Sequence, residues 1–211
     1  MTSARRLFAA ALLFTVAACS QVSPPGGAQP GLGAQAFGTR QNDEVLALAT
    51  YQGGVYAVGN TKGSLYAPNR GDTDVFITRV GSNKRTVWSR QFGTPNADEA
   101  AKVATDTSGN VYVFGQTGGA LARALRGSSD FFLRKYTAAG STVWTRQVGL
   151  EAGETPLDLR VTGNSVYAAG RSGGEYVIYR YTSRGSLTGT ALLLRLPNVK
   201  AFGPRRVRAR R

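Results

Sequence analysis

Two pairs of adjacent carboxylates are the residues in this chain whose type and spacing could support chemistry. Asp43 precedes Glu44, and Asp98 precedes Glu99. Paired carboxylates can divide the roles of general acid and general base, or they can bind Ca²⁺ together. A catalytic pair is needed once, whereas these pairs hold the same place in two successive copies of a repeated unit. The recurrence therefore favours a structural role.

Other catalytic and metal-binding groups are scarce. The 211 residues include no histidine and one cysteine, which excludes the commonest general base, a disulfide framework and any cysteine-rich zinc site. Residues 106–110 read Asp-Thr-Ser-Gly-Asn, which looks like part of a calcium loop. The glutamate that completes an EF-hand is missing downstream. We therefore expect a hairpin turn here, with no metal and no cofactor.

The net charge of +14 is concentrated toward the ends of the chain. Arg5, Arg6 and seven bases between residues 195 and 211 contribute +9 with no acid among them. The residues between these two regions hold 17 bases against 12 acids. This central part lacks the clustered basic face that nucleic-acid-binding proteins carry. We predict that nucleic acid is not a partner.

The first residues have the organisation of a bacterial export signal. Arg5 and Arg6 precede an apolar segment that ends in Val-Ala-Ala before Cys19, and it is shorter than the roughly 20 residues of a membrane-spanning helix. The Val-Ala-Ala-Cys sequence resembles a lipobox, which implies lipidation of Cys19 and removal of residues 1–18; an ordinary secretory signal is the alternative. Residues 19–35 are rich in Pro and Gly and should form a flexible tether. We expect a membrane-anchored lipoprotein of the cell envelope that faces the periplasm or the exterior.

Residues 36–194 repeat one long unit. A Val-Tyr-x-x-Gly block occurs three times, at steps of 56 and 55 residues. Such self-similarity is typical of repeat architectures. We assign three units, at residues 36–90, 91–146 and 147–194. The positions expected to be structural in each copy are Gly59, Gly115, Gly170, Asp74, Asp130, Trp88 and Trp144.

Each unit is expected to fold into four short strands. In the second unit these lie at residues 99–105, 110–116, 131–137 and 142–147, because these runs are rich in β-branched and aromatic residues and are separated by turn residues. The loop between the second and third strands is long and Gly-rich, and the matching loop in the third unit is about ten residues shorter. Repeat proteins usually place variable, ligand-facing length on one rim in this way.

The repeated blocks resemble the bacterial seven-bladed β-propeller repeat family. The resemblance rests on Gln-Phe-Gly at 91–93, Asp-x-x-Gly-Asn-Val-Tyr-Val-x-Gly at 106–115 and Gly-x-x-Val-Trp at 140–144, and it extends from residue 36 to about residue 190. The third unit departs from the pattern in its fourth strand, where Leu-Thr-Gly replaces the Val-Trp pair. The resemblance implies an all-β chain: a partial β-propeller of about three four-stranded antiparallel blades, with a signal or disordered N-terminus and an irregular basic tail at 195–211.

Three units are fewer than the roughly 4 to 8 blades of a closed propeller. An open arc exposes the apolar faces of its end blades. We expect one of three resolutions: the chain is a truncated or partial propeller, blade edges self-associate to complete a ring, or a terminus curls over the open face. The basic tail has neither strand nor turn pattern, which favours the first.

The two tryptophans bear on whether the chain is a binding module or an enzyme. Trp88 and Trp144 fill the same slot in two units, which favours packing between blades. The same Gly-then-Trp ending is loosely similar to repeats of quinone-dependent propeller dehydrogenases, which would make the chain an enzyme. Without a histidine, we predict no catalysis. The sequence favours a lipid-anchored, non-catalytic binding or scaffolding module for an unknown protein or polysaccharide; a quinoprotein-like enzyme and a truncated, non-functional product are the alternatives.

Overall fold

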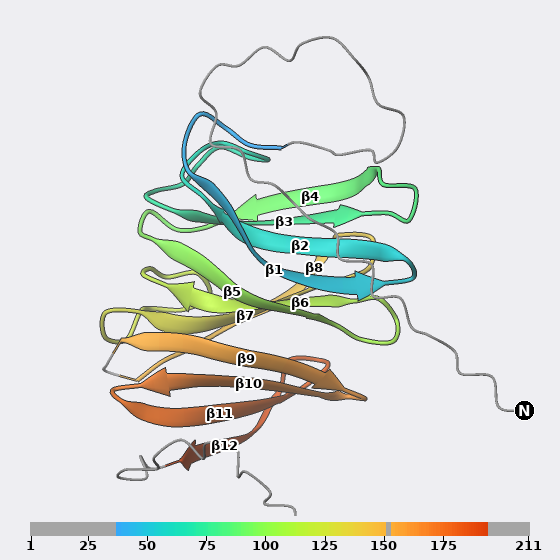
Figure 1. The fold of residues 1–211 in the computed structure, drawn as a ribbon. Helices are drawn as coiled ribbons and strands as arrows, with labels where there is room; N and C mark the ends of the chain where they lie inside the picture. Colours follow the sequence, from blue (N-terminus) through green and yellow to red (C-terminus); the bar gives the residue numbers. More distant parts are fainter. Residues whose placement is uncertain (1–36, 151–152, 194–211) are drawn as a thin grey trace, which may run out of the picture.

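The computed structural model describes residues 37–150 and 153–193 (Figure 1). The predicted signal peptide, the tether with Cys19 and the basic tail lie outside these residues. Every regular element in the described part of the chain is a β-strand: β1 (Asp43–Tyr51), β2 (Gly54–Thr61), β3 (Asp74–Val80), β4 (Thr86–Phe92), β5 (Asp98–Thr105), β6 (Val111–Thr117), β7 (Asp130–Tyr136), β8 (Thr142–Val148), β9 (Glu154–Thr162), β10 (Ser165–Ser172), β11 (Glu175–Thr182) and β12 (Leu187–Leu193).

The strands form three four-stranded antiparallel sheets, and each sheet is a simple meander in chain order. The first sheet contains β1–β4, the second β5–β8 and the third β9–β12. Figure 1 shows the sheets stacked in sequence order, with β5 lying beside both β1 and β9. The first and third sheets lie at opposite ends, so the described stack does not close on itself. The predicted all-β partial propeller of three four-stranded blades is confirmed.

The strands of the second unit lie within one residue of the bounds predicted from the sequence. Gly109 and Gly140 occupy its two hairpin turns at φ values of 78° and 84°, where residues with a side chain are strained. In the first turn, the Asp106 carboxylate accepts hydrogen bonds from the backbone N–H groups of Ser108 and Asn110 at 3.0 and 2.9 Å. The calcium-like segment is therefore a hairpin turn, as expected.

The fourth strand of the third unit forms although its sequence departs from the repeat. In β12, Gly189 lies opposite Arg180 of β11, as Trp144 lies opposite Lys135 in the second sheet. Strand pairing depends on backbone groups, so it does not need an indole at this position. The tryptophan of the repeat therefore has its role between sheets and not within one.

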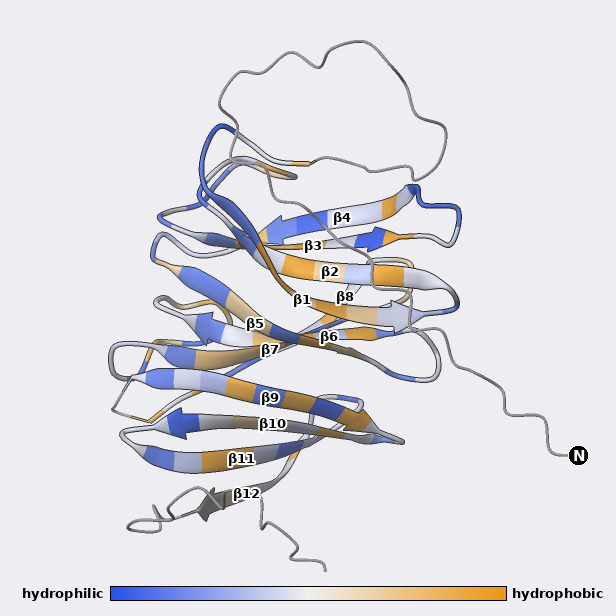
Figure 2. Cartoon of the chain, viewed as in Figure 1, coloured by the Kyte–Doolittle hydropathy of each residue, from blue (hydrophilic) through white to orange (hydrophobic). Residues whose placement is uncertain are grey.

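The core consists of two layers, one at each boundary between sheets. Val111 and Val113 of β6 belong to the first layer, whereas the alternate residues Tyr112 and Phe114 belong to the second. This alternation is the period of a strand that is buried on both faces. Figure 2 shows apolar residues gathered along the strands, with hydrophilic residues at their ends and in the connections. The second sheet is thus packed between the first and the third, with a core layer on each of its faces.

Candidate binding site at the boundary of the first two sheets

The carboxylate pairs found in the sequence lie where β1 and β5 begin. The Asp43 carboxylate accepts hydrogen bonds from Thr39 and from Thr61 of β2. Asp98 accepts from the backbone N–H and the hydroxyl of Thr94 at 2.5 and 2.8 Å. The same residue in each copy therefore ties the incoming connection to the first strand of its sheet. Both carboxylates are already engaged in hydrogen bonds that shape the fold.

Glu154 takes the same position in the third sheet. Its carboxylate accepts hydrogen bonds from the Leu150 N–H at 2.8 Å and the Ser172 hydroxyl at 3.0 Å. Burial raises the pKa of Glu154 above its ordinary value, and the nearby Asp130 adds to the increase. Burial likewise raises the pKa of Asp98, although its hydrogen bonds oppose the shift. Removing charge from water is what favours the protonated form in both cases.

Asp74 and Asp130, at the starts of β3 and β7, are fully buried. Each accepts a hydrogen bond of 2.9 Å from a glutamine amide, Gln91 for Asp74 and Gln147 for Asp130. The glutamine carbonyl oxygen accepts backbone N–H groups of the loop between the second and third strands, as Gln91 does from Leu65 at 2.8 Å. This Asp–Gln pair therefore holds the long loop of its sheet in place.

Gly59, Gly115 and Gly170 lie where neighbouring atoms leave no room for a side chain. A Cβ would lie 1.8 Å from the Glu44 carbonyl oxygen at Gly59, and 2.0 Å from that of Glu99 at Gly115. At Gly170 it would lie 2.2 Å from the ring of a phenylalanine in the preceding sheet. Each glycine faces the irregular part of the first strand of its sheet. Close approach, and not a positive φ, requires glycine at these positions.

Trp88 and Trp144 fasten each sheet to the one that follows. The Trp88 indole N–H donates to the Ala138 carbonyl in the β7–β8 turn at 2.9 Å. Its ring covers Gly140, where a Cβ would lie 2.6 Å from a ring carbon. Trp144 repeats the arrangement in the next turn, with the Ser183 carbonyl at 3.2 Å and Gly185 under its ring. We call this indole–glycine contact the boundary lock.

The boundary lock needs an indole from one sheet and a turn glycine from the next. Each outer sheet has only one of these two residues. In the first sheet, Lys84 holds the turn position of Gly140 and Gly185, with a φ of 62°. In the third sheet, Gly189 holds the position of the tryptophan. Only the second sheet of the described stack has both the glycine and the indole.

The long loops occupy one rim of the stack. The β2–β3 and β6–β7 connections, residues 62–73 and 118–129, each have twelve residues, whereas β10 and β11 are joined by Gly173 and Gly174 alone. The shorter loop predicted for the third unit is therefore confirmed. The connection from β4 to β5 begins at Gly93 and lies beside these loops, since Gly118 donates its N–H to the Ala97 carbonyl at 2.7 Å.

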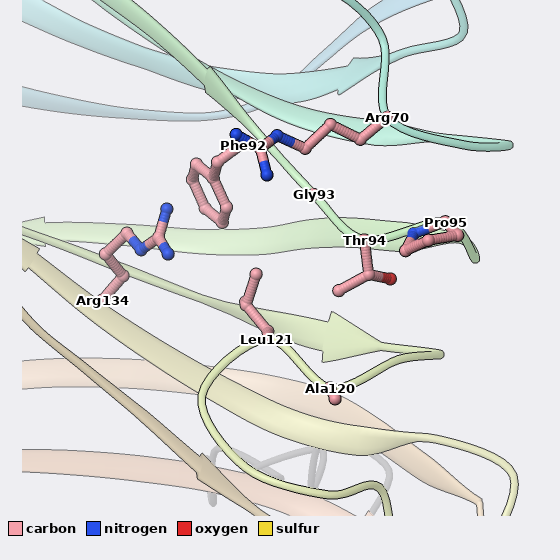
Figure 3. A pocket seen from close by; sticks show the side chains of 8 residues that line it. All are labelled: Arg70, Phe92, Gly93, Thr94, Pro95, Ala120, Leu121 and Arg134. Carbon is pink, nitrogen blue, oxygen red and sulfur yellow. The ribbon is translucent and has the colours of Figure 1, made fainter.

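A pocket of about 340 Å³ lies at this rim, between the first and second sheets (Figure 3). Its walls come from the end of β4, from the β4–β5 connection, from both long loops and from β7. The lining residues are Arg70, Phe92, Gly93, Thr94, Pro95, Ala120, Leu121 and Arg134. In Figure 3 the side chains of Arg70 and Arg134 extend toward Phe92 from different sheets. The pocket thus joins two cations to an apolar wall.

Sequence reasoning did not single out Arg70 or Arg134. Comparing the three units position by position would have found Arg134. The residue at the same register position is Thr78 in the first sheet and Tyr179 in the third. A long cationic side chain stands at this position in one unit only. The sequence predictions noted what recurs and overlooked this departure.

Within residues 37–150 and 153–193, no helix has the length and apolar composition needed to cross a membrane. In the same residues, no three side chains of His, Cys, Asp or Glu gather closely enough to hold a metal ion. The candidate site is therefore described by its arginines, its aromatic wall and its loops.

The stacked meanders and their repeated boundary contacts define a partial β-propeller. The model of the beta-propeller repeat family matches residues 87–121. This match runs from β4 through β6 into the next loop, and it includes six of the eight residues that line the pocket. The chain thus carries the beta-propeller repeat that its sequence resembles. No curated protein matches the chain.

Proposed function

We propose that this chain is a non-catalytic binding or scaffolding module, held at the cell envelope by lipid on Cys19. The observation that carries the proposal is the pocket at the rim between the first two sheets. Its walls combine β4 of the first sheet and β7 of the second with two long loops, which is how repeat proteins commonly form a binding surface. The export pattern from Arg5 to Cys19 supports the anchored location.

Three features support binding in preference to catalysis. The carboxylates considered for acid–base chemistry, Asp43 and Asp98, accept hydrogen bonds from their own connections. The two indoles that are similar to those of quinone-dependent repeats are 8% exposed and hydrogen-bonded to a neighbouring turn. The chain also has no histidine to act as a general base.

Anchoring is tested by a Cys19→Ser substitution in a bacterial host, followed by separation of membranes from soluble envelope contents. We expect the substitution to release the protein from the membrane fraction, because a diacylated or triacylated cysteine provides the stable attachment. Ser20→Ala is the matched control and should stay in the membrane. Unchanged sedimentation of Cys19→Ser with membranes would contradict the anchor.

Binding is tested with the purified Cys19→Ser chain against a panel of bacterial envelope polysaccharides. Saturable binding by a cooperatively folded chain is the expected result. Dye reduction that depends on an added quinone cofactor would contradict the non-catalytic assignment. A protein partner and self-association of blade edges stay predictions.

A further inference from the structure

Arg134 is an exception to the repeat that calls for a separate explanation. Its side chain packs on Phe92 of the neighbouring sheet, whereas the residues at the same register position in the first and third sheets are Thr78 and Tyr179. Placing a guanidinium at a partly buried position is unfavourable unless other groups compensate for its lost hydration. Residues that break a local pattern are frequently those that a function requires.

The surroundings fix the Arg134 side chain and leave its charge unbalanced. Its Nε donates to the Thr145 hydroxyl at 2.7 Å, and its guanidinium carbon lies 3.8 Å from the centre of the Phe92 ring. A guanidinium carries five N–H donors, and the hydrogen bonds of Arg134 within the described residues go to neutral groups. None of the ion pairs in the described part of the chain includes Arg134.

Arg70 supplies a second guanidinium from the first long loop. Its backbone N–H donates to the buried Asp74 carboxylate at 3.1 Å, so the base of the side chain is fixed while its exposed end is free to adjust. Arg70 also takes part in no ion pair among the described residues. One wall of the pocket thus offers a rigid cation and the other offers an adjustable one.

We infer that this pocket binds an oxyanion group, a carboxylate, sulfate or phosphate, carried by a ligand of about one sugar ring. Arginine matches the planar, two-oxygen face of such groups with paired N–H donors. The volume of about 340 Å³ is at the lower end of the range for small-molecule sites. Phe92 and Leu121 add apolar surface for the body of the ligand. The inference rests on the proposed binding function and names its ligand class.

The second boundary provides an internal control. Arg126 has the place of Arg70 on the next long loop, and its N–H donates to Asp130 at 3.2 Å. The residue that corresponds to Arg134 there is Tyr179. Arg126 therefore shares the loop position and the charge of Arg70, but the position of Arg134 holds no cation there, and the nearby Arg123 is paired with Asp130 at 3.5 Å. An anion that binds through net charge alone would not distinguish the two.

The test is calorimetric titration of the full chain carrying Cys19→Ser, at constant ionic strength, with glucuronate, sulfate and inorganic phosphate. Glucose is the uncharged control. We expect glucuronate to bind and glucose not to bind. Arg70→Gln, which changes an exposed side chain, should weaken binding about 10- to 100-fold, the range for losing hydrogen bonds to a charged group. Arg126→Gln should leave it unchanged. Arg134→Met keeps much of the packing on Phe92, and its melting curve shows whether lost binding reflects lost folding.

Each outcome supports or overturns the inference. If glucuronate binds more tightly than sulfate and phosphate, the ligand is an acidic sugar. If the three anions bind with equal affinity, the pocket recognises the oxyanion group alone. Equal weakening by Arg70→Gln and Arg126→Gln overturns the inference, because net charge then explains the binding. Failure of every anion to bind a folded chain also overturns it. The binding function itself would survive that result if a neutral polysaccharide still bound.

Discussion

At the scale of the residue, the second boundary lock depends on Trp144. Its indole is 8% exposed and packs on Gly185, while its N–H reaches the Ser183 carbonyl. Replacing it with alanine removes a buried aromatic ring, so we expect Trp144→Ala to lower the free energy of unfolding by about 3–5 kcal/mol in urea denaturation. The neighbouring Val143 is 49% exposed, and Val143→Ala should change stability by about 0.5 kcal/mol or less. Similar midpoints for the two variants would contradict the packing role.

Glu154 should make stability depend on pH. Burial raises its pKa above the ordinary value of 4.5, so between the two values the folded chain holds more protons than the unfolded chain. Stability therefore falls as pH rises through that window. The Oε1 of glutamine can accept the bonds from Leu150 and Ser172, so we expect Glu154→Gln to be more stable than the parent at pH 7.

The advantage of Glu154→Gln should shrink as the pH falls toward 4.5, because the parent carboxyl then becomes neutral as well. Thermal melts of both proteins from pH 4.5 to 7.5 measure the difference. Glu44→Gln is the control, since Glu44 is the exposed acid next to the equivalent position in β1. A difference that stays constant with pH would show that titration of Glu154 does not contribute.

At the scale of the element, the long loops should be separable from the sheets that carry them. Replacing residues 118–129 with the Gly-Gly of the β10–β11 turn keeps the ends of β6 and β7 in a register that the third sheet already uses. We expect a cooperative β fold with a loss of about 1–3 kcal/mol, because hydrogen bonds to Gln147 and Asp130 disappear.

The same loop replacement removes Ala120 and Leu121 from the pocket wall. Glucuronate titration should then show no binding, while circular dichroism retains the β spectrum. The corresponding connection in the first sheet, residues 62–73, carries Arg70 and should give the same result when shortened. If a variant with a shortened loop still bound glucuronate, the binding site would lie outside this pocket.

The strands of the second unit could be predicted because their signals are local. Apolar runs alternate with turns that contain Gly109 and Gly140, and both glycines adopt the positive φ that such turns need. The pocket could not be found in this way, because Phe92 and Arg134 meet across two sheets. A single unit does not specify how it rotates against its neighbour. The recurrence of Asp43 and Asp98 did point to equivalent positions, since a repeated position experiences a repeated environment.

At the scale of the whole molecule, equivalent residues differ in burial according to whether a sheet follows. Phe131 of β7 and Tyr176 of β11 hold the same register position, but their exposed fractions are 1% and 45%. We expect Phe131→Ala to lower the free energy of unfolding by about 3–5 kcal/mol. Tyr176→Ala should lower it by about 1 kcal/mol or less, because little is buried there. Chemical denaturation of the two variants side by side measures the contribution of the following sheet, and equal losses would indicate that the outer face of the third sheet is covered.

The uneven distribution of the boundary lock determines which segment could seed an artificial array. Tandem copies of the second sheet would each present a glycine to the copy before and an indole to the copy after, so every junction would contain both halves of the boundary lock. Concatenated first sheets would set Trp88 against Lys84, and concatenated third sheets would leave Gly185 with no indole to cover it. Polymers of designed length should therefore be obtainable from one module of this chain and from neither of its neighbours.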